Sequence, residues 1–135
     1  MRYMMLIYSQ ETESELTREE AGKLMTAHEA AIEEAARKGV LRGAEPLSPT
    51  RTATTVRMHD GQALTTDGPF AETKEQLAGY YILECENLDE AIEWAARIPT
   101  SCKGGEGCIE IRPLPGLPAR QPTQANACQP ATVNG

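Results

Sequence analysis

Hydrophobic residues divide the chain into strand-like and helix-like segments. Residues 2–8 are apolar on both faces, which favours a central strand covered on both sides over a surface strand. Residues 40–47 and 80–85 predict further strands, and residues 108–112 alternate cleanly between polar and apolar positions. We therefore expect a sheet whose strands come from both halves of the sequence.

Two segments have the spacing of amphipathic helices. The first begins at the capping box Thr17-Arg18-Glu19-Glu20, in which hydroxyl and carboxylate each bond an otherwise unpaired amide, and it ends at Gly39. The second is capped by Asn87 and stopped by Pro99. The predicted apolar stripes are Ala21, Leu24, Met25, His28, Ala31, Ile32 and Ala35 in the first helix, and Leu88, Ala91, Ile92, Ala95 and Ile98 in the second.

A hairpin and a sharp corner separate the two halves. Residues 52–58 are rich in β-branched side chains, Asp60-Gly61 is a favoured two-residue turn, and residues 63–66 run back antiparallel. In the corner Asp67-Gly68-Pro69, the aspartate can cap the turn with its carboxylate, the glycine tolerates positive φ, and the proline has a fixed φ. We expect this corner to be rigid, and Phe70, the only phenylalanine, to lie in a dry environment.

The order strand, helix, strands, helix, strand predicts a ferredoxin-like α+β domain, a split β-α-β with an inserted β-hairpin. Its antiparallel sheet would carry two helices on one face. The other face also needs cover, because the first strand is apolar on both sides, and a second copy of the chain is the most economical cover. The domain is expected over residues 1–114, followed by a Pro-rich flexible tail over residues 115–135.

Length and charge narrow the function classes. A chain of 135 residues has room for one domain. Its formal net charge of −7 predicts that neither nucleic acid nor an anionic membrane is a partner, because both would be repelled. No apolar run approaches the ~20 residues of a membrane span, and no signal-peptide core follows Met1-Arg2. We expect a cytoplasmic protein.

The four cysteines form no recognisable metal or disulfide pattern. Cys85 falls in a predicted strand and Cys128 in the polar tail, and no C-x-x-C pair or zinc-spaced histidine occurs, so ordinary thiols are expected. Cys102 and Cys108 flank Lys103-Gly104-Gly105-Glu106-Gly107 and are the pair to watch. That segment lacks the features of a dinucleotide loop or a P-loop, and no G-x-S-x-G elbow occurs. No cofactor and no metal are predicted.

His28 is the leading candidate for chemistry. It lies on the apolar stripe of the first predicted helix, so its imidazole should face the sheet. There it could act as a general acid or base if a carboxylate orients it. A core histidine bonded to a backbone carbonyl is the alternative, and position alone favours it. His59, beside the hairpin turn, is expected to be solvated.

Asp67 has a functional and a structural interpretation. It could pair with His28 or bind a cation, or it could cap its own turn, which is the common role of Asp-Gly. The charged residues and the aromatic that follow are typical of a pocket lip, although a solvated helical turn has the same pattern. The predicted ligand-binding residues are Tyr3, Phe70, Glu72, Lys74 and Tyr80, and the remaining tyrosines, Tyr8 and Tyr81, are strand residues that fit pocket lining or core equally.

One long run of residues resembles a known family. The run is Thr66-Asp67-Gly68-Pro69-Phe70-Ala71-Glu72-Thr73-Lys74-Glu75, followed by Leu77-Ala78-Gly79-Tyr80-Tyr81. Weaker matches are Leu88-Asp89-Glu90-Ala91, Trp94-Ala95-Ala96-Arg97 with Pro99, and Ile109-Glu110-Ile111-Arg112-Pro113. With these motifs the chain resembles the DGPF group of YCII-related proteins from Arg2 to about Leu114.

The resemblance implies a ferredoxin-like domain that forms a homodimer sheet to sheet, as in the dimeric α+β barrels. For some members it implies a setting beside extracytoplasmic-function sigma factors, and for a few YCII-like relatives a His-Asp pair in a cleft. His28, eleven residues before Gly39, falls where the YCII-like histidine falls. No position here matches the YCII-like aspartate, and Asp67 is the substitute that we consider.

These observations lead to three hypotheses. The first is a homodimer with a small-molecule pocket between helix and sheet, where His28 is the acid or base and Asp67 orients it or shapes the corner. An isomerase-like or hydrolytic reaction at a carbonyl-type substrate would fit, since proton transfer needs only a tuned histidine and a partner. The second is a non-catalytic binding or regulatory module that docks a protein, and the third is a structural dimer without a ligand.

Overall fold

A computed structural model describes residues 1–11, 17–100 and 107–117. The chain forms two compact units, and each is described by itself. The core unit comprises Met1–Pro49 and Thr73–Pro115, and the hairpin unit comprises Thr50–Glu72. Most of the expected tail, residues 115–135, lies outside the described residues. Two of the cysteines, Cys102 and Cys128, also lie outside them.

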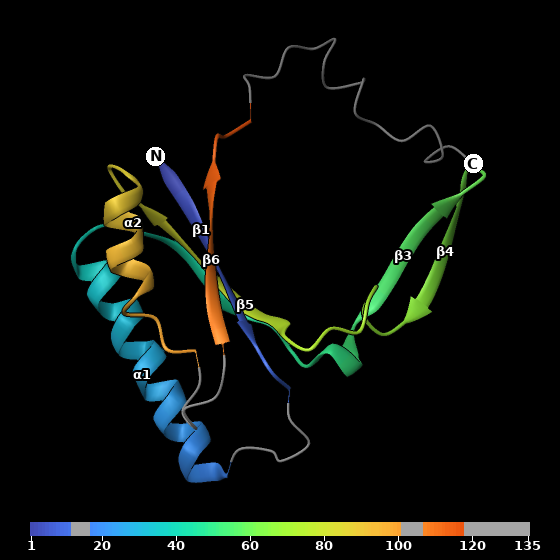
Figure 1. Ribbon diagram of the computed structural model, residues 1–135, viewed down its shortest axis with the longest axis horizontal. Coiled ribbons are helices and arrows are strands. Elements are labelled where there is room, and N and C mark those ends of the chain that lie inside the picture. The colour runs from blue at the N-terminus through green and yellow to red at the C-terminus, as the bar shows by residue number, and fades with distance from the viewer. Residues whose placement is uncertain (12–16, 101–106, 118–135) are drawn as a thin grey trace. The chain divides into compact units, whose positions relative to one another are not determined.

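The core unit is a four-stranded antiparallel sheet with two helices on one face (Figure 1). The strand order is β2-β5-β1-β6, so the first strand of the sequence lies at the centre. This is the ferredoxin-like α+β arrangement that the sequence predicts, and the hairpin is inserted between the second and third strands of its sheet. The elements are β1 (Arg2–Ser9), α1 (Arg18–Arg37), β2 (Leu41–Pro46), β5 (Gln76–Glu84), α2 (Leu88–Ala95) and β6 (Gly107–Leu114).

The helix ends confirm the capping signals. The amide of Glu20 donates to Thr17 Oγ1 over 3.1 Å, and the amide of Glu90 donates to Asn87 Oδ1 over 2.9 Å. Each bond satisfies one of the amides that a helix start leaves unpaired. At the far end of α1, Lys38 is the C-cap and Gly39 follows it. Among the described residues, no helix is long and apolar enough to cross a membrane.

The burial of the side chains of β1 explains why its sequence is apolar on both faces. Tyr3, Met5 and Ile7 are buried on the face that the helices cover, whereas Met4 and Leu6 alternate with them and are only half-buried. The opposite face of the sheet is therefore apolar at its centre and less buried than the face on which the helices pack. The buried core comprises Tyr3, Met5, Ile7, Ala35, Tyr81, Leu83, Cys85, Ala91, Trp94, Ala95 and Ile98.

The predicted stripe of α1 is only partly correct. Ala31, Ile32 and Ala35 pack on the core, but Met25 is 60% exposed and Ala21 is exposed as well. The stripe thus continues beyond the length over which α1 contacts the core. His28 lies at the boundary between the packed and the exposed parts of the helix.

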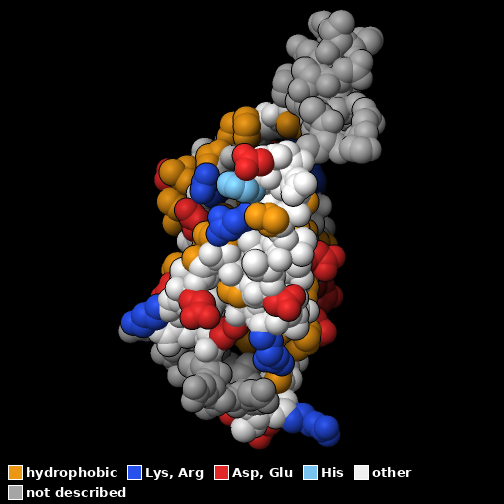
Figure 2. All heavy atoms as spheres, turned by 90° about the vertical axis from the view of Figure 1, so that its right-hand side faces the viewer, with side chains coloured by type: hydrophobic (Ala, Val, Ile, Leu, Met, Phe, Trp, Pro, Cys, Tyr) orange, Lys and Arg blue, Asp and Glu red, His pale blue; other side chains and the backbone are white. Residues whose placement is uncertain are grey.

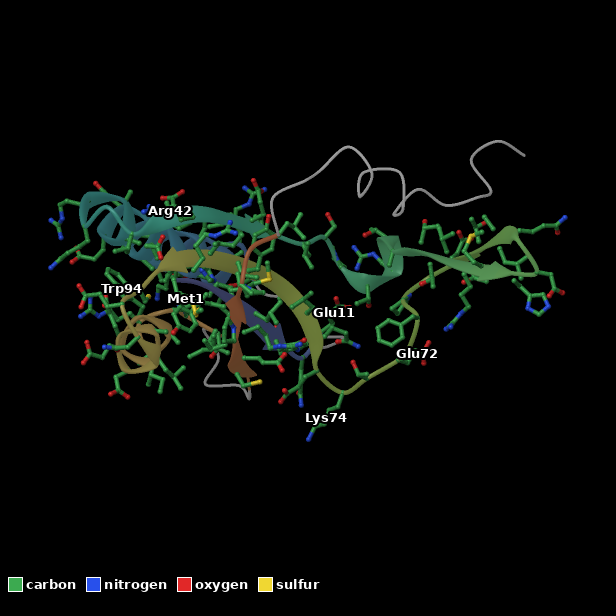
Figure 3. The ribbon with its side chains drawn as sticks, turned by 90° about the horizontal axis from the view of Figure 1, so that it is seen from above. Met1, Glu11, Arg42, Glu72, Lys74 and Trp94 are labelled. Carbon is green, nitrogen blue, oxygen red and sulfur yellow. The ribbon has the colours of Figure 1, made fainter. Side chains whose placement is uncertain are left out.

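The buried face of α2 is rotated relative to the apolar stripe predicted from its sequence. Ile92 is 49% exposed, whereas Trp94 is only 8% exposed. Ala91, Trp94, Ala95 and Ile98 form the buried face, with the same i, i+3, i+4, i+7 spacing as the expected stripe. The indole has more apolar area to bury than the isoleucine side chain, and this decides which face turns inward. Trp94 is labelled on α2 in Figure 3, and residues of both helices line the small cavity next to it.

The hairpin unit contains β3 (Thr54–His59) and β4 (Gln62–Asp67), preceded by a short 3-10 turn, Thr50–Thr52. Asp60 and Gly61 both have positive φ, as in the primed turns that favour hairpins, so this prediction is confirmed. Hydrophobic side chains, orange in Figure 2, reach the surface there. Phe70 is 77% exposed, and the expectation of a dry environment is wrong. A two-stranded sheet has no second layer within its own unit that could cover the ring.

The corner after β4 is fixed through the backbone of Gly68. Its φ is +98°, a conformation that favours glycine. The Gly68 amide donates to the Ala53 carbonyl over 2.7 Å, and Thr55 Oγ1 donates to the Gly68 carbonyl over 2.8 Å. These bonds tie the corner to the start of the hairpin. The expected rigidity therefore rests on Gly68 and its partners.

Gly79 permits a close approach of β2 and β5, and its replacement should destabilise the sheet. A Cβ at this position would lie 2.8 Å from the Glu45 carbonyl oxygen and 3.2 Å from Pro46 Cα, both backbone atoms. We expect Gly79→Ala to lower the free energy of unfolding by about 1–3 kcal/mol, measured by urea denaturation. Gly43→Ala is the matched control, since its Cβ would meet only Ile82 Cδ1 at 3.8 Å. Equal effects of the two substitutions would contradict this account.

Candidate functional site

His28 projects from α1 onto the sheet and contacts Tyr81. His28 Nδ1 lies 2.8 Å from the Tyr81 hydroxyl, and the two ring centroids are 6.0 Å apart. Tyr81 is buried in β5, whereas His28 is half-buried. The imidazole therefore faces the sheet, as the helical spacing predicts. Its side-chain partner is a phenol, and neither a backbone carbonyl nor a carboxylate occupies this position.

The position of Tyr81 follows from the alternation of β5. Tyr81 and Leu83 are buried toward the helices, whereas Tyr80 lies between them in sequence and points to the opposite face. In the sheet, Tyr81 is paired with Met5 of β1 and Ala44 of β2. It thus stands at the centre of the sheet, below the last turns of α1. This register brings together two side chains that are 53 residues apart in sequence.

Burial keeps both members of the pair uncharged near neutral pH. Desolvation lowers the pKa of His28 from its ordinary value of 6.5. Desolvation also raises the pKa of Tyr81 to about 12. The pair therefore combines a neutral imidazole with a protonated phenol. Such a pair can donate and accept hydrogen bonds without placing a charge in the core.

Two hollows of the core unit bear on this pair, and one of them touches it, through Tyr81. An apolar cavity of about 20 Å³ is bounded by Tyr81, Leu83, Trp94 and Ile98, and it is no larger than a water site. A groove of about 560 Å³ runs along α2 between Lys38, Glu93 and Arg97, whose guanidinium carbon is 4.8 Å from the Trp94 ring centroid. His28 lines neither hollow.

The other predicted site residues are spread over several surfaces. Tyr3 is buried on the helix-covered face of the sheet, and Tyr80 lies on the opposite face. Lys74 is exposed, and its side chain points away from the ribbon (Figure 3). The remaining three, Asp67, Phe70 and Glu72, are exposed residues of the hairpin unit. Within the core unit, His28 is brought together with Tyr81 and with none of the predicted lining residues.

The cysteines and the second histidine are placed as follows. Cys85 is buried, and Cys108 is exposed with its Sγ 3.6 Å from Glu75 Oε2. Desolvation and the Glu75 carboxylate raise the pKa of Cys108, which disfavours the reactive thiolate. His59 is exposed beside Asp60, with 3.2 Å between Nε2 and Oδ2, as expected for a turn residue. In the part of the chain that the structure describes, no group of three or more His, Cys, Asp or Glu side chains could hold a metal ion.

The lowered pKa of His28 predicts a pH-dependent stability. The unfolded chain binds a proton to this histidine below pH 6.5, whereas the folded chain resists protonation. Stability should therefore fall as the pH drops through 6.5 and level off below the folded pKa. His28→Asn should lose this component, which urea denaturation of both proteins at several pH values would show. An identical pH profile for the two proteins would contradict the prediction.

Comparisons with known proteins show the family of this chain. The model of the YCII-related domain matches residues 1–115. An uncharacterised protein of Rhizobium meliloti (strain 1021), R00369, is 37% identical over 115 residues, which cover 84% of this chain and 92% of that protein. The match extends through the core unit and the hairpin unit alike. The chain therefore belongs to the YCII-related family.

Proposed function

We propose that the chain is a homodimeric YCII-related protein of the DGPF group that binds a small carbonyl-type molecule beside His28 and transfers a proton to or from it. The observation that carries this proposal is the 2.8 Å contact between His28 Nδ1 and the Tyr81 hydroxyl. A histidine held by a buried phenol has a defined ring orientation, which general acid–base chemistry requires. An isomerase-like or hydrolytic reaction fits these groups.

The protonation states support this chemistry. At neutral pH His28 is uncharged, because desolvation lowers its pKa, and it is half-buried at the level where α1 leaves the core. A titratable group with a shifted pKa and a fixed partner is a typical member of an active site. Asp67 is proposed to shape its own corner in the hairpin unit. Of the predicted lining residues, the proposal retains Tyr3, which is buried on the face of the sheet that the helices cover.

The proposed homodimer uses the face of the sheet opposite the helices. Met4, Leu6, Tyr80 and Ile82 are half-buried at the centre of this face. Register pairing puts Leu6 beside Tyr80 and Met4 beside Ile82, so the four side chains are contiguous. Charged residues of the outer strand, such as Glu110 and Arg112, are exposed at the edge. An apolar centre with a polar rim fits a two-fold contact between identical surfaces.

Dimerisation should depend on Leu6. We expect Leu6→Glu to convert the protein to a monomer in sedimentation velocity, because the substitution places a carboxylate at the centre of the contact. Added salt should strengthen the wild-type dimer, since two copies each carry a formal net charge of −7 and repel one another. Thr26→Glu, at an exposed position of α1, is the control and should leave the dimer unchanged. A wild-type protein that sediments as a monomer would remove this part of the proposal.

The ligand can be sought by thermal shift. A compound that binds the folded chain raises its melting temperature by mass action, in proportion to RT ln(1 + [L]/Kd). A library of small carbonyl compounds and carboxylic acids, screened against purified protein, should contain compounds that stabilise the wild type. A library without any stabilising compound would count against the small-molecule site.

A second candidate function is a non-catalytic regulatory or binding module. It is supported by the exposed apolar side chains of the hairpin unit, namely Val56 at 58%, Met58 at 57% and Phe70 at 77%. Such side chains are typical of a surface that docks a protein. For the DGPF group the setting would be extracytoplasmic-function sigma factor regulation. In this case Phe70→Ser should abolish co-purification of the partner while leaving the thermal shift with small molecules unaffected.

A further inference from the structure

We infer that Tyr81 fixes the tautomer of His28, so that the ring hydrogen is on Nε2 and the site recognises an acceptor oxygen, either a carbonyl or a carboxylate. In this arrangement the Tyr81 hydroxyl donates to Nδ1. Tyr81 is thus a positioning residue, and His28 presents an N–H donor to the ligand. The tautomer stands on the geometry alone, whereas the ligand class rests on the proposed function.

The direction of the hydrogen bond follows from the two acceptors near the phenol. The Tyr81 hydroxyl has one hydrogen, and it lies 2.8 Å from His28 Nδ1 and 3.5 Å from the His28 carbonyl oxygen. A contact of 3.5 Å is at the limit of a hydrogen bond, and a carbonyl within a helix already accepts the amide four residues on. A phenol is also a stronger acid than the N–H of a neutral imidazole. The hydrogen therefore points to Nδ1.

The second ring nitrogen is then a donor with no partner among the described residues. No hydrogen bond or ion pair of His28 Nε2 occurs in residues 1–11, 17–100 and 107–117. A neutral imidazole can carry only one ring hydrogen, so Nδ1 as acceptor requires Nε2–H. A neutral N–H donor in a desolvated site stabilises negative charge that develops on a carbonyl oxygen. His28 would act as the acid, and any base must come from another group.

This assignment also restricts the role of Asp67. With Nδ1 occupied by Tyr81, a carboxylate could contact the ring only at Nε2, which is the nitrogen that the ligand needs. An orienting Asp67 and a ligand at Nε2 exclude one another.

The tautomer is measured by long-range ¹H–¹⁵N NMR of the imidazole rings in the full chain, with His28→Asn identifying the signals. Above the His28 pKa, we expect the pattern of the Nε2–H form. Tyr81→Phe should give a mixture of tautomers, whereas Tyr8→Phe, which removes a hydroxyl paired with Glu110, should keep the wild-type pattern. The Nδ1–H pattern in the wild type would overturn the inference, and so would a Tyr81→Phe spectrum identical to it.

The ligand class is tested with two probes that share a ring and differ in their polar group. Benzoate offers acceptor oxygens, and benzylamine offers donors only. Benzoate is expected to shift the Nε2 signal in a saturable manner. A response to benzylamine instead, or to neither probe, would overturn the ligand class. Because the tautomer is measured without any ligand, its result stands whether or not the proposed function fails.

Discussion

His28→Ala is expected to abolish the stabilisation of the protein by its ligand. A ligand present at about 100 times its Kd stabilises a folded protein by about 2.7 kcal/mol. The variant lacks the ring that contacts Tyr81 Oη at 2.8 Å and that would contact the ligand, so the thermal shift should disappear. Where turnover is measurable, losing an acid or base typically costs about 10²–10⁴-fold in rate.

The chain contains a matched control for this substitution. His59 is its only other histidine, and it is exposed in the hairpin turn beside Asp60. His59→Ala should retain the full thermal shift and the full rate. If His28→Ala binds the ligand as the wild type does, the ligand site lies elsewhere and the proposed role of His28 is wrong.

Trp94→Ala should cause the largest loss of stability of any single side chain that we consider. Trp94 is 8% exposed and belongs to the same buried core cluster as Ala35 and Tyr81. Truncating a buried tryptophan typically costs about 3–5 kcal/mol, because apolar area is lost and a cavity remains. Since small domains are stable by only about 5–15 kcal/mol, this variant should be close to unfolding. Urea denaturation monitored by circular dichroism would measure the change.

Ile92→Ala is the control, because Ile92 lies on the same helix and is 49% exposed. We expect it to cost less than half as much as Trp94→Ala. Equal losses, or a larger loss for Ile92→Ala, would mean that α2 is rotated toward the stripe expected from its sequence. The pair of variants therefore reports directly on which face of α2 is buried.

The comparison of these two residues shows how far the sequence predicts this fold. The caps at Thr17 and Asn87, the hairpin turn at Asp60 and the order of elements along the chain depend on local signals, and they are confirmed. The orientation of α2 is different. Both possible stripes have helical spacing, and the choice between them is made by packing against the sheet.

The candidate site could be predicted only in part. Helical spacing places His28 toward the sheet, but its partner Tyr81 is 53 residues away and depends on the register of β5. Tyr80 and Tyr81 are adjacent in sequence and lie on opposite faces, so only the three-dimensional pairing decides which one reaches the histidine. For Phe70 the local signal was misleading. Its apolar character predicts burial, but the hairpin unit provides no second layer to cover the ring, which is exposed.

The most direct measurement of the central claim is a titration of the best-stabilising compound followed through the ring nitrogens of His28 by ¹⁵N NMR. The account predicts that the Nε2 signal shifts in a saturable manner, with the same Kd as the thermal shift, while the Nδ1 signal stays that of an acceptor bonded to Tyr81. A compound that stabilises the protein and leaves both His28 nitrogens unchanged would contradict it.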